Sequence, residues 1–333
     1  MKRRILSMIL TLVMVLSMLP ATALTAWAAE DDIMPQADDD EVAPPADEEA
    51  IFDGEGTEDS PDQTADEVVP LANSAFGEGD GDGTKEDPYK ISTAEQLDAV
   101  KNDLTAHYEL VTDIHLEDSD YADNWTPIGN STTSFTGTFD GKGNEITGLY
   151  VTGTTYRGLF GYVGSGGTVE NVTVSGTVSG STLVGGVAAR NAGTIKNCYN
   201  DCDVTGKTTS TSTQGVGGVV GYNTGTIENC HNTGTVVNDG TSGYTGGVVG
   251  YNSGTVTDCD NTKAVTGKKN TGGVVGYVDG GTVAGCHNKG EVTGSSDNTG
   301  GVAGYVNSYS TVENCYNTGK VAGTADKIGR AHV

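Results

Sequence analysis

Apolar residues in the second half of the chain return in short runs separated by glycine and asparagine. The phrase Gly-Gly-Val-Val-Gly-Tyr begins at Gly217, Gly246 and Gly272, and variants of it begin at Gly185 and Gly300. Each phrase is followed by a second apolar run that ends in cysteine, and then by an asparagine. Short runs rich in β-branched residues and bounded by turn residues predict β-strands.

The cysteines that end these runs set the period of the pattern. Subtraction of residue numbers gives intervals of 32, 29, 27 and 29 along the series Cys198, Cys230, Cys259, Cys286 and Cys315. A repeat of about 30 residues is typical of a solenoid, in which each repeat packs on the preceding one. The sequence therefore predicts an all-β solenoid of about seven coils over residues 135–326, with parallel strands about 4.8 Å apart between coils.

Residues 245–271 illustrate one predicted coil. Its apolar runs predict three strands, at Gly246–Tyr251, Thr255–Cys259 and Ala264–Thr266. Stacking brings equivalent residues into columns, and two columns are expected in the interior: Val187, Val219, Val248, Val274 and Val302, and Val169, Ile195, Ile227, Val256, Val283 and Val312. A third column is expected at turns, with left-handed backbone and amides hydrogen-bonded between coils: Asn200, Asn232, Asn261, Asn288 and Asn317.

Residues 1–28 have the pattern of a secretory signal peptide. Basic residues 2–4 precede an apolar run at 5–19, and Ala26 and Ala28 are the small residues of a cleavage site. An uncleaved membrane anchor is the alternative, but the run is short for a bilayer span of about 20 residues. We therefore expect a secreted, extracellular protein with no transmembrane span after signal cleavage.

The segment between the signal peptide and the repeats has two predicted parts. Residues 29–83 are acidic and poor in large apolar residues, so they are predicted to form a disordered linker. Residues 84–134 are predicted to form an N-terminal cap, because an open solenoid end would expose its apolar interior and unpaired strand edges. A capping box at 92–95, followed by apolar residues at helical spacing, predicts one short helix in this cap.

Composition and charge narrow the range of partners. The chain has 333 residues, 50 glycines and a formal net charge of −27 at pH 7. Glycine at this level, without a collagen triplet, is typical of the tight turns of all-β repeat folds. The negative charge argues against nucleic acid or anionic lipid as a partner, because both bind to basic patches.

Residues 158–162, Gly-Leu-Phe-Gly-Tyr, resemble the GLUG motif found in repeats of bacterial surface proteins. The Gly-Gly-Val-Val-Gly-Tyr phrases are similar to variants of that motif. Five short segments resemble the usual start of such regions: Gly83-Thr84, Pro88-Tyr89, Ala94–Leu97, Trp125–Gly129 and Phe135–Gly141. The resemblance covers about residues 83–323 and implies a right-handed parallel β-helix in a secreted or surface-attached bacterial protein.

The resemblance does not imply an enzyme, because GLUG repeats generally accompany other modules. Some surface metallopeptidases that cleave immunoglobulin A carry such repeats beside a His-Glu-x-x-His catalytic domain. That motif does not occur in this sequence. The resemblance therefore gives no peptidase activity to this chain.

The cysteine column is expected to consist of reduced, buried side chains that act as small apolar residues. Disulfides between neighbouring coils are the alternative, since export normally permits them. Strand spacing is, however, slightly wider than the Cβ separation that a disulfide prefers. Zinc needs converging ligands, and a linear column does not converge, so we expect no metal and no cofactor. Cys202 lies off the column, four residues from Cys198.

A further column holds the candidate ligand-binding residues, Tyr222, Tyr251, Tyr277 and Tyr305. Tyr162 extends this column, and Arg190 interrupts it. Facing outward, the rings would form an aromatic strip on which sugars stack, whereas the alternative is a packed ladder or a solvent-shielding stripe. Strand alternation does not decide between them, because valines neighbour the tyrosines on both faces.

The charged residues of the repeats do not predict an active site. Glu170, Glu228 and Glu313 share a column, but Lys196 and uncharged residues occupy the coils between them. Acid/base cleavage of glycans needs two carboxylates close together. We expect no matched carboxylates on neighbouring coils in this column.

Two histidines share another column. His231 and His287 lie two coils apart, separated by Asp260, and neither is near an evident nucleophile. We therefore expect no catalytic residues and no enzyme activity in this chain.

Three functions remain as hypotheses. The first is a non-enzymatic, adhesin-like protein of a bacterial surface that binds host or matrix glycans or proteins, as a monomeric rod or as part of a longer chain. The first alternative is the N-terminal repeat region of a larger surface enzyme, a peptidase or glycan-active enzyme, whose catalytic domain lies elsewhere. The second is a β-helical polysaccharide lyase or hydrolase.

The last residues of the chain have an unusual sequence. Residues 328–333, Ile-Gly-Arg-Ala-His-Val, read as the translation of a common sequencing-adapter end, ATC GGA AGA GCA CAC GTC. We therefore interpret residues 327–333 as an artefact and expect the natural protein to continue beyond about residue 326.

Overall fold

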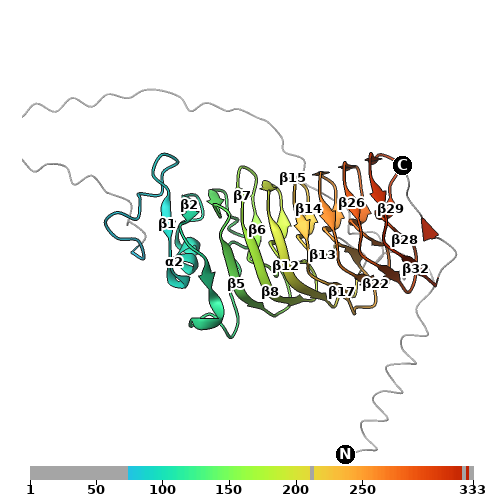
Figure 1. Ribbon diagram of the computed structural model, residues 1–333, viewed down its shortest axis with the longest axis horizontal. Helices are drawn as coiled ribbons and strands as arrows, with labels where there is room; N and C mark the ends of the chain where they lie inside the picture. The colour runs from blue at the N-terminus through green and yellow to red at the C-terminus, as the bar shows by residue number, and fades with distance from the viewer. Residues whose placement is uncertain (1–73, 211–213, 325–327, 330–333) are drawn as a thin grey trace, which may run out of the picture. The chain divides into compact units, whose positions relative to one another are not determined.

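The computed structural model describes residues 74–210, 214–324 and 328–329. The predicted signal peptide, most of the predicted linker and all of the predicted artefact except residues 328–329 lie outside them. Within the described residues the chain forms the predicted parallel β-helix of about seven coils (Figure 1). Its strands pair in parallel with their counterparts in the next coil throughout.

Four parallel sheets, named A to D here, run along the described coils. Sheet A consists of β1 (Tyr89–Ile91), β2 (His107–Leu110), β4 (Thr138–Asp140), β7 (Thr168–Glu170), β11 (Thr194–Lys196), β15 (Thr226–Glu228), β20 (Thr255–Thr257), β25 (Thr282–Ala284) and β30 (Thr311–Glu313). Sheet B consists of β3 (Ile114–His115), β5 (Glu145–Val151), β8 (Thr173–Gly180), β12 (Tyr199–Gly206), β16 (His231–Asn232), β17 (Val236–Asn238), β21 (Asp260–Asn261), β22 (Val265–Gly267), β26 (His287–Asn288), β27 (Val292–Gly294), β31 (Tyr316–Asn317) and β32 (Val321–Gly323). Sheet C consists of β6 (Phe160–Val163), β10 (Ala188–Asn191), β14 (Val220–Asn223), β19 (Val249–Asn252), β24 (Val275–Val278) and β29 (Ala303–Val306). Sheet D consists of β9 (Val184–Gly185), β13 (Gly215–Gly217), β18 (Tyr244–Gly246), β23 (Thr271–Gly272), β28 (Thr299–Gly300) and β33 (Ile328–Gly329).

The repeated Gly-Gly-Val-Val-Gly-Tyr phrase forms a corner between two sheets. In the coil at 244–271, β18 ends at Gly246 and β19 begins at Val249, so Gly247 and Val248 carry the chain from sheet D to sheet C. The prediction of one strand at Gly246–Tyr251 is therefore wrong, as is the prediction of three strands per coil. This coil has five short strands, of which β21 and β22 both lie in sheet B.

Close backbone contact explains why glycine recurs at this corner. A Cβ on Gly247 would lie 2.2 Å from the carbonyl oxygen of Gly273 and 2.4 Å from Cγ of Asn261. A Cβ on Gly250 would lie 2.4 Å from the backbone nitrogen of Val216, which belongs to sheet D of the preceding coil. All three distances are shorter than real Cβ contacts. Sheets C and D thus pack backbone against backbone, which only glycine permits.

The interior contains the two predicted apolar columns. Their members are fully buried, except that Val312 in the last coils is partly buried against the same cluster. The in-register pairing of Ile195, Ile227 and Val256 shows directly that these residues stack from coil to coil. Burial of aliphatic side chains at about 25 cal/mol per Å² is the main favourable contribution to this fold.

The predicted asparagine column forms a hydrogen-bonded ladder inside the solenoid. Each amide donates to the side-chain oxygen of the next, at 2.7–2.8 Å, along Asn200, Asn232, Asn261, Asn288 and Asn317. A second amide ladder that the sequence did not predict joins Asn191, Asn223 and Asn252 at 2.8 Å. Except for Asn317 at the ladder's end, these amides are fully buried, and their hydrogen bonds offset the loss of solvation.

The left-handed backbone positions differ from those predicted. Asn200 and its equivalents lie in or beside extended strands. Positive φ occurs instead at the residue before each of the five column cysteines: φ is 53° at Asn197, 48° at Asn229, 53° at Asp258, 64° at Gly285 and 53° at Asn314. The prediction was wrong because asparagine favours both left-handed turns and amide ladders, and the two asparagine columns lie only three residues apart.

One short helix lies in the N-terminal cap, as predicted. Helix α2 (Ala94–Ala99) begins after Thr93, whose side chain accepts a hydrogen bond from Gln96 N at 3.2 Å. The Gln96 side chain accepts from Ser92 N at 2.8 Å, so the capping interaction lies one residue later than predicted. Two short 3-10 helices, η2 (Val100–Asn102) and η3 (Leu116–Asp118), complete the helical part of the cap.

The cap also includes the last residues of the predicted linker. Phe76 is buried and its ring stacks on Tyr89, with centroids 4.4 Å apart. The backbone nitrogen of Lys90 donates to the carbonyl of Asp80 at 2.7 Å. Residues 74–83 are therefore part of the folded cap, because Phe76 supplies an apolar anchor within an otherwise acidic sequence.

Candidate functional site

The predicted tyrosine column lies on sheet C. Strand pairing places its members in register on consecutive coils, in the order Tyr162, Arg190, Tyr222, Tyr251, Tyr277 and Tyr305. The four candidate residues are therefore neighbours, and Arg190 occupies the position of a tyrosine.

The tyrosine rings stack on one another. Ring centroids are 4.8 Å apart for Tyr222 and Tyr251, 5.3 Å for Tyr251 and Tyr277, and 5.2 Å for Tyr277 and Tyr305. The interplanar angles are between 5° and 17°. The faces of Tyr251 and Tyr277 are thus occupied by neighbouring rings.

Residues from other positions cover the middle of the column. Tyr244, at the start of β18, packs against Tyr251 and Tyr277 with centroid distances of 5.5 and 4.7 Å. The Tyr251 hydroxyl donates to Asp279 Oδ2 at 2.5 Å. Burial, and then this hydrogen bond, raise the pKa of Tyr251 far above its usual range. Burial raises the pKa of Tyr244 and Tyr277 as well, so these rings remain neutral into the alkaline range.

Arg190 replaces one ring of the stack with a guanidinium group. Its Cζ lies 4.5 Å from the centroid of Tyr162 and 5.4 Å from that of Tyr222, which is cation–π geometry. Its Nε is buried without a hydrogen-bond partner. Within the described part of the chain no carboxylate lies within 4.0 Å of the guanidinium. The Nε–H group of Arg190 is therefore a buried donor without an acceptor.

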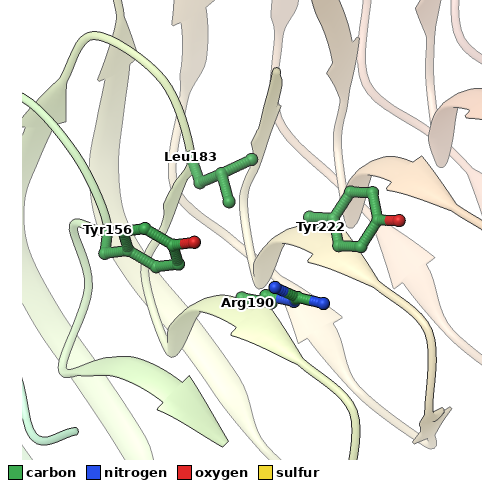
Figure 2. A pocket seen from close by; sticks show the side chains of 4 residues that line it. All are labelled: Tyr156, Leu183, Arg190 and Tyr222. Atoms are coloured by element: carbon green, nitrogen blue, oxygen red, sulfur yellow. The ribbon is translucent and has the colours of Figure 1, made fainter. Parts of the chain in front are cut away.

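A cavity opens beside this arginine. Its volume is about 220 Å³, and it is lined by Tyr156, Leu183, Arg190 and Tyr222. Figure 2 shows the two tyrosines on either side, with Leu183 and Arg190 facing each other across the opening. We name this cavity the Arg190 pocket.

The Arg190 pocket exists because one coil lacks a covering side chain. Strand register places Gly215 between Leu183 in the preceding coil and Tyr244 in the next. Tyr244 covers the tyrosine column in its own coil, whereas Gly215 has no side chain to cover Tyr222. Tyr251 is consequently only 9% exposed, while Tyr222 borders open space.

The two predicted histidines lie in one column on sheet B. The order of side chains is Tyr199, His231, Asp260, His287 and Tyr316. Both imidazoles approach the Asp260 carboxylate. His231 donates a hydrogen bond from Nδ1 to Oδ1, and His287 Nε2 lies 3.9 Å from Oδ2. Tyr199 stacks on His231 and Tyr316 on His287, at 4.5 and 4.9 Å. Tyr199 and Tyr316 directly follow a column cysteine, as His231 and His287 do, so the repeat spacing already places them in this column.

The histidine column shows no metal-binding arrangement. Among the residues that the structure describes, no three histidine, cysteine or carboxylate side chains are placed to hold a metal ion.

One acidic column differs from the prediction. Glu109, Asp140 and Glu170 pair in register on consecutive coils of sheet A, so carboxylates do occupy matched positions on neighbouring coils. Lys142 Nζ lies 3.2 Å from Glu109 and 3.1 Å from Asp140, and Lys196 Nζ lies 2.9 Å from Glu170. The first coils lack the repeated phrase, and for this reason their register was not evident from the sequence.

Contacts with lysine determine whether the carboxylates of this acidic column can act as acids in catalysis. Burial acts to raise the pKa of Asp140, but hydrogen bonds from Asn171 and Lys142 outweigh it and lower that pKa. A glycosidase acid needs the opposite, a raised pKa that keeps the proton available. The column is thus a ladder of ion pairs.

The six cysteines are free and buried, as expected. In the column each thiol donates to a carbonyl two residues earlier, for example Cys259 Sγ to Thr257 O at 3.0 Å. Burial raises the pKa of Cys202, and burial likewise raises that of Cys230. Thiols with a raised pKa are poor nucleophiles, so Cys202 and Cys230 are structural.

The described residues include no helix of the length and apolar character that a membrane span requires.

A family model described as the GLUG motif matches residues 212–237, 268–293 and 295–322. Among curated proteins, a provisionally described Gly-rich membrane protein of Evansella cellulosilytica is 43% identical over 129 residues, which is 35% of this chain and 15% of that protein. Halomucin of Haloquadratum walsbyi is 35% identical over 139 residues, 38% of this chain and 2% of that protein. The match thus spans only a small part of either relative.

Two solved structures share the fold. A Bacteroides ovatus protein, provisionally described as an immunoglobulin A1 protease, superposes with a TM-score of 0.57 and 21% identity, over 79% of this chain and 90% of that one. A second structure, named IgA1 protease, has a TM-score of 0.54 and 17% identity, over 72% of this chain and 20% of that one. At these identities the likeness concerns the fold alone. Three stretches of this chain thus match the GLUG motif, and they lie in repeats of a parallel β-helix.

Proposed function

We propose that this chain is a non-enzymatic, adhesin-like protein of a cell surface that binds glycans at the Tyr222 end of the tyrosine column. The observation that carries this proposal is the Arg190 pocket, where two tyrosines border an open cavity. Tyrosine binds sugars well because it combines an apolar ring with a hydroxyl that donates and accepts hydrogen bonds. The stacked rings on one side hold Tyr222 in place, so little ordering is needed when a ligand binds.

A surface location is supported by two independent features. Residues 1–28 have the pattern of a signal peptide. The curated relatives are described as a Gly-rich membrane protein and as halomucin. We infer that this chain is exported and acts outside the cell.

A role without catalysis is supported by the state of the acidic residues. The matched carboxylates on sheet A are paired with Lys142 and Lys196. The two histidines approach Asp260 and not a hydroxyl nucleophile. These arrangements favour stability of the stack over proton transfer.

The test is a glycan array probed with the full chain and two single-residue variants. Tyr222→Ala should remove binding because it takes away one wall of the pocket. Tyr309→Ala is the matched control, since Tyr309 is 89% exposed and lies outside the column. Glycan binding that survives Tyr222→Ala, or no binding by the unaltered chain, would contradict the proposal.

A second candidate is the non-catalytic part of a larger surface enzyme. It is favoured by the solved structure named IgA1 protease, of which this fold covers 20%. Expression of the complete natural gene and assay of immunoglobulin A cleavage would test it. Cleavage by the complete product, but not by this chain, is the expected result. Lack of cleavage by the complete product would exclude it.

A further inference from the structure

Arg190 carries unmet binding capacity. Its guanidinium has five N–H donors, it meets no acceptor among the described residues, and its Nε is buried without a partner. A buried donor left unpaired is unfavourable, and an acceptor on a ligand would satisfy it. Every other described position of the column from Tyr162 to Tyr305 is tyrosine, so the stack itself does not require an arginine.

The charge around Arg190 is also not compensated. Arg190 forms no ion pair with a described residue, although the whole chain has a formal net charge of −27. In an acidic protein, an arginine without a carboxylate partner marks a local site for an anion.

The shape of the guanidinium selects the kind of anion. Its planar fork matches the two oxygens of a carboxylate, which it binds through parallel, charge-assisted hydrogen bonds. The rings of Tyr162 and Tyr222 cover its two faces. An anion therefore has to approach the edge of the guanidinium, where those parallel bonds form.

The other residues that line the Arg190 pocket determine which part of a ligand, besides the anionic group, can bind there. Tyr156 and Tyr222 bring two hydroxyls, and Leu183 brings an apolar surface. A volume of about 220 Å³ is below the roughly 300–1,000 Å³ of sites for whole small molecules, so one ring of a longer chain fits it better. The backbone of Tyr156 has φ of 56°, a conformation that large residues rarely adopt and that is often found at binding sites.

The surroundings argue against a peptide. Peptides usually bind by adding a strand to a free sheet edge or by filling an apolar groove. Strands β10 and β14 have partners on both sides, so no edge is free beside the Arg190 pocket. An acidic sugar needs neither feature, since its carboxylate and hydroxyls bind to the guanidinium and the tyrosines.

We propose that the Arg190 pocket binds the carboxylate of an acidic sugar, a uronate or a sialate, with Arg190 as the bidentate partner. This assignment rests on the proposed glycan-binding function and names the class of glycan. Tyr156 and Tyr222 bind ring hydroxyls, and Leu183 contacts the apolar side of the ring. The neutral members of the same glycan chains lack the carboxylate and bind more weakly.

The experiment is calorimetric titration of the full chain with two pairs of probes. Sialyllactose is compared with lactose, and a glucuronate-containing hexasaccharide is compared with its carboxyl-reduced form. The first pair tests the sialate source and the second the uronate source. In at least one pair the acidic member should bind at least about tenfold more tightly, as expected for a charge-assisted hydrogen-bond pair.

Three variants separate the causes. Arg190→Tyr restores the usual residue of the column and should abolish the preference for the acidic probe, while Arg190→Lys keeps the charge without the fork and should retain only part of it. Lys289→Gln removes an exposed positive charge elsewhere and should change nothing. Thermal unfolding of each variant shows whether the fold is kept.

The outcomes distinguish the two proposals. Equal binding of acidic and neutral probes overturns the acidic-sugar assignment and leaves glycan binding intact. Binding of acidic peptides that depends on Arg190 also overturns the assignment to sugars. Failure of every glycan to bind overturns both proposals.

Discussion

Substitution of Asn261 by alanine tests how much the buried amide ladder contributes to stability. Asn261 lies in the middle of the ladder and is fully buried. Its side chain accepts from Asn232 at 2.7 Å and donates to Asn288 at 2.7 Å. It also donates to the carbonyl of Lys263 at 2.7 Å and accepts from the nitrogen of Lys263 at 3.4 Å.

The magnitude follows from these four hydrogen bonds. At about 1 kcal/mol of net stability for each, Asn261→Ala should lower the free energy of unfolding by about 4 kcal/mol. Asn317→Ala is the matched control at the end of the same ladder. Asn317 has one ladder bond, from Asn288 at 2.7 Å, and is partly exposed, so water replaces its lost partners. Its substitution should cost about 1–2 kcal/mol.

Urea unfolding of the full chain, followed by far-UV circular dichroism, measures both changes. Hydrogen exchange of peptides covering residues 230–290 shows whether the loss is local to the substituted coil, because stacked repeats can unfold in parts. Equal losses for the two variants, or a loss below about 1 kcal/mol for Asn261→Ala, would refute the ladder as a major source of stability.

Three further predictions follow from the same coils. Gly250→Ala should destabilise the chain by about 1–3 kcal/mol or more in urea unfolding, because its Cβ would meet backbone at 2.4 Å. Gly77→Ala is the control and should be neutral, because its Cβ meets only a side-chain oxygen at 3.8 Å. Equal effects of the two substitutions would argue against the tight corner. Because the pKa of Tyr251 is raised in the folded state, its contribution to stability is complete below about pH 10 and falls above it, by about 1.4 kcal/mol per pH unit. Ultraviolet titration of Asp279→Asn should show that Tyr251 ionises at lower pH than in the unaltered chain. An unchanged titration would contradict the role of the hydrogen bond from Tyr251 to Asp279. Cys259, which is buried and free, should react with a thiol reagent only after denaturation, and rapid labelling of the native chain would be inconsistent with a closed interior.

Column membership could be predicted because it depends only on counting residues between repeated phrases. The spacing of the cysteines therefore identified which valines, asparagines and tyrosines stack. The corner at Gly247 could not be predicted in the same way, because a strand and a tight corner have the same apolar pattern when two glycines precede two valines. Only the closeness of sheets C and D distinguishes them.

The candidate site was partly predictable for a related reason. Register predicted that Tyr222 and Arg190 are neighbours, but the Arg190 pocket depends on Gly215, a residue of another sheet that provides no side chain. A pocket created by a missing side chain leaves no motif in the sequence. The ion-pair ladder of Glu109 and Asp140 was missed because the first coils do not carry the phrase that sets the register.

The in-register pairing of all four sheets has a consequence for how such genes change length. Each coil presents to its successor the same hydrogen-bonding groups that its predecessor presented to it, as in the series Thr245, Thr271 and Thr299 on sheet D. Deletion of one whole coil would therefore join two surfaces that already fit, whereas deletion of part of a coil would shift every column. Unequal recombination between neighbouring repeats is thus tolerated in steps of one coil, and the number of coils on either side of the Arg190 pocket is free to vary without redesign of the fold.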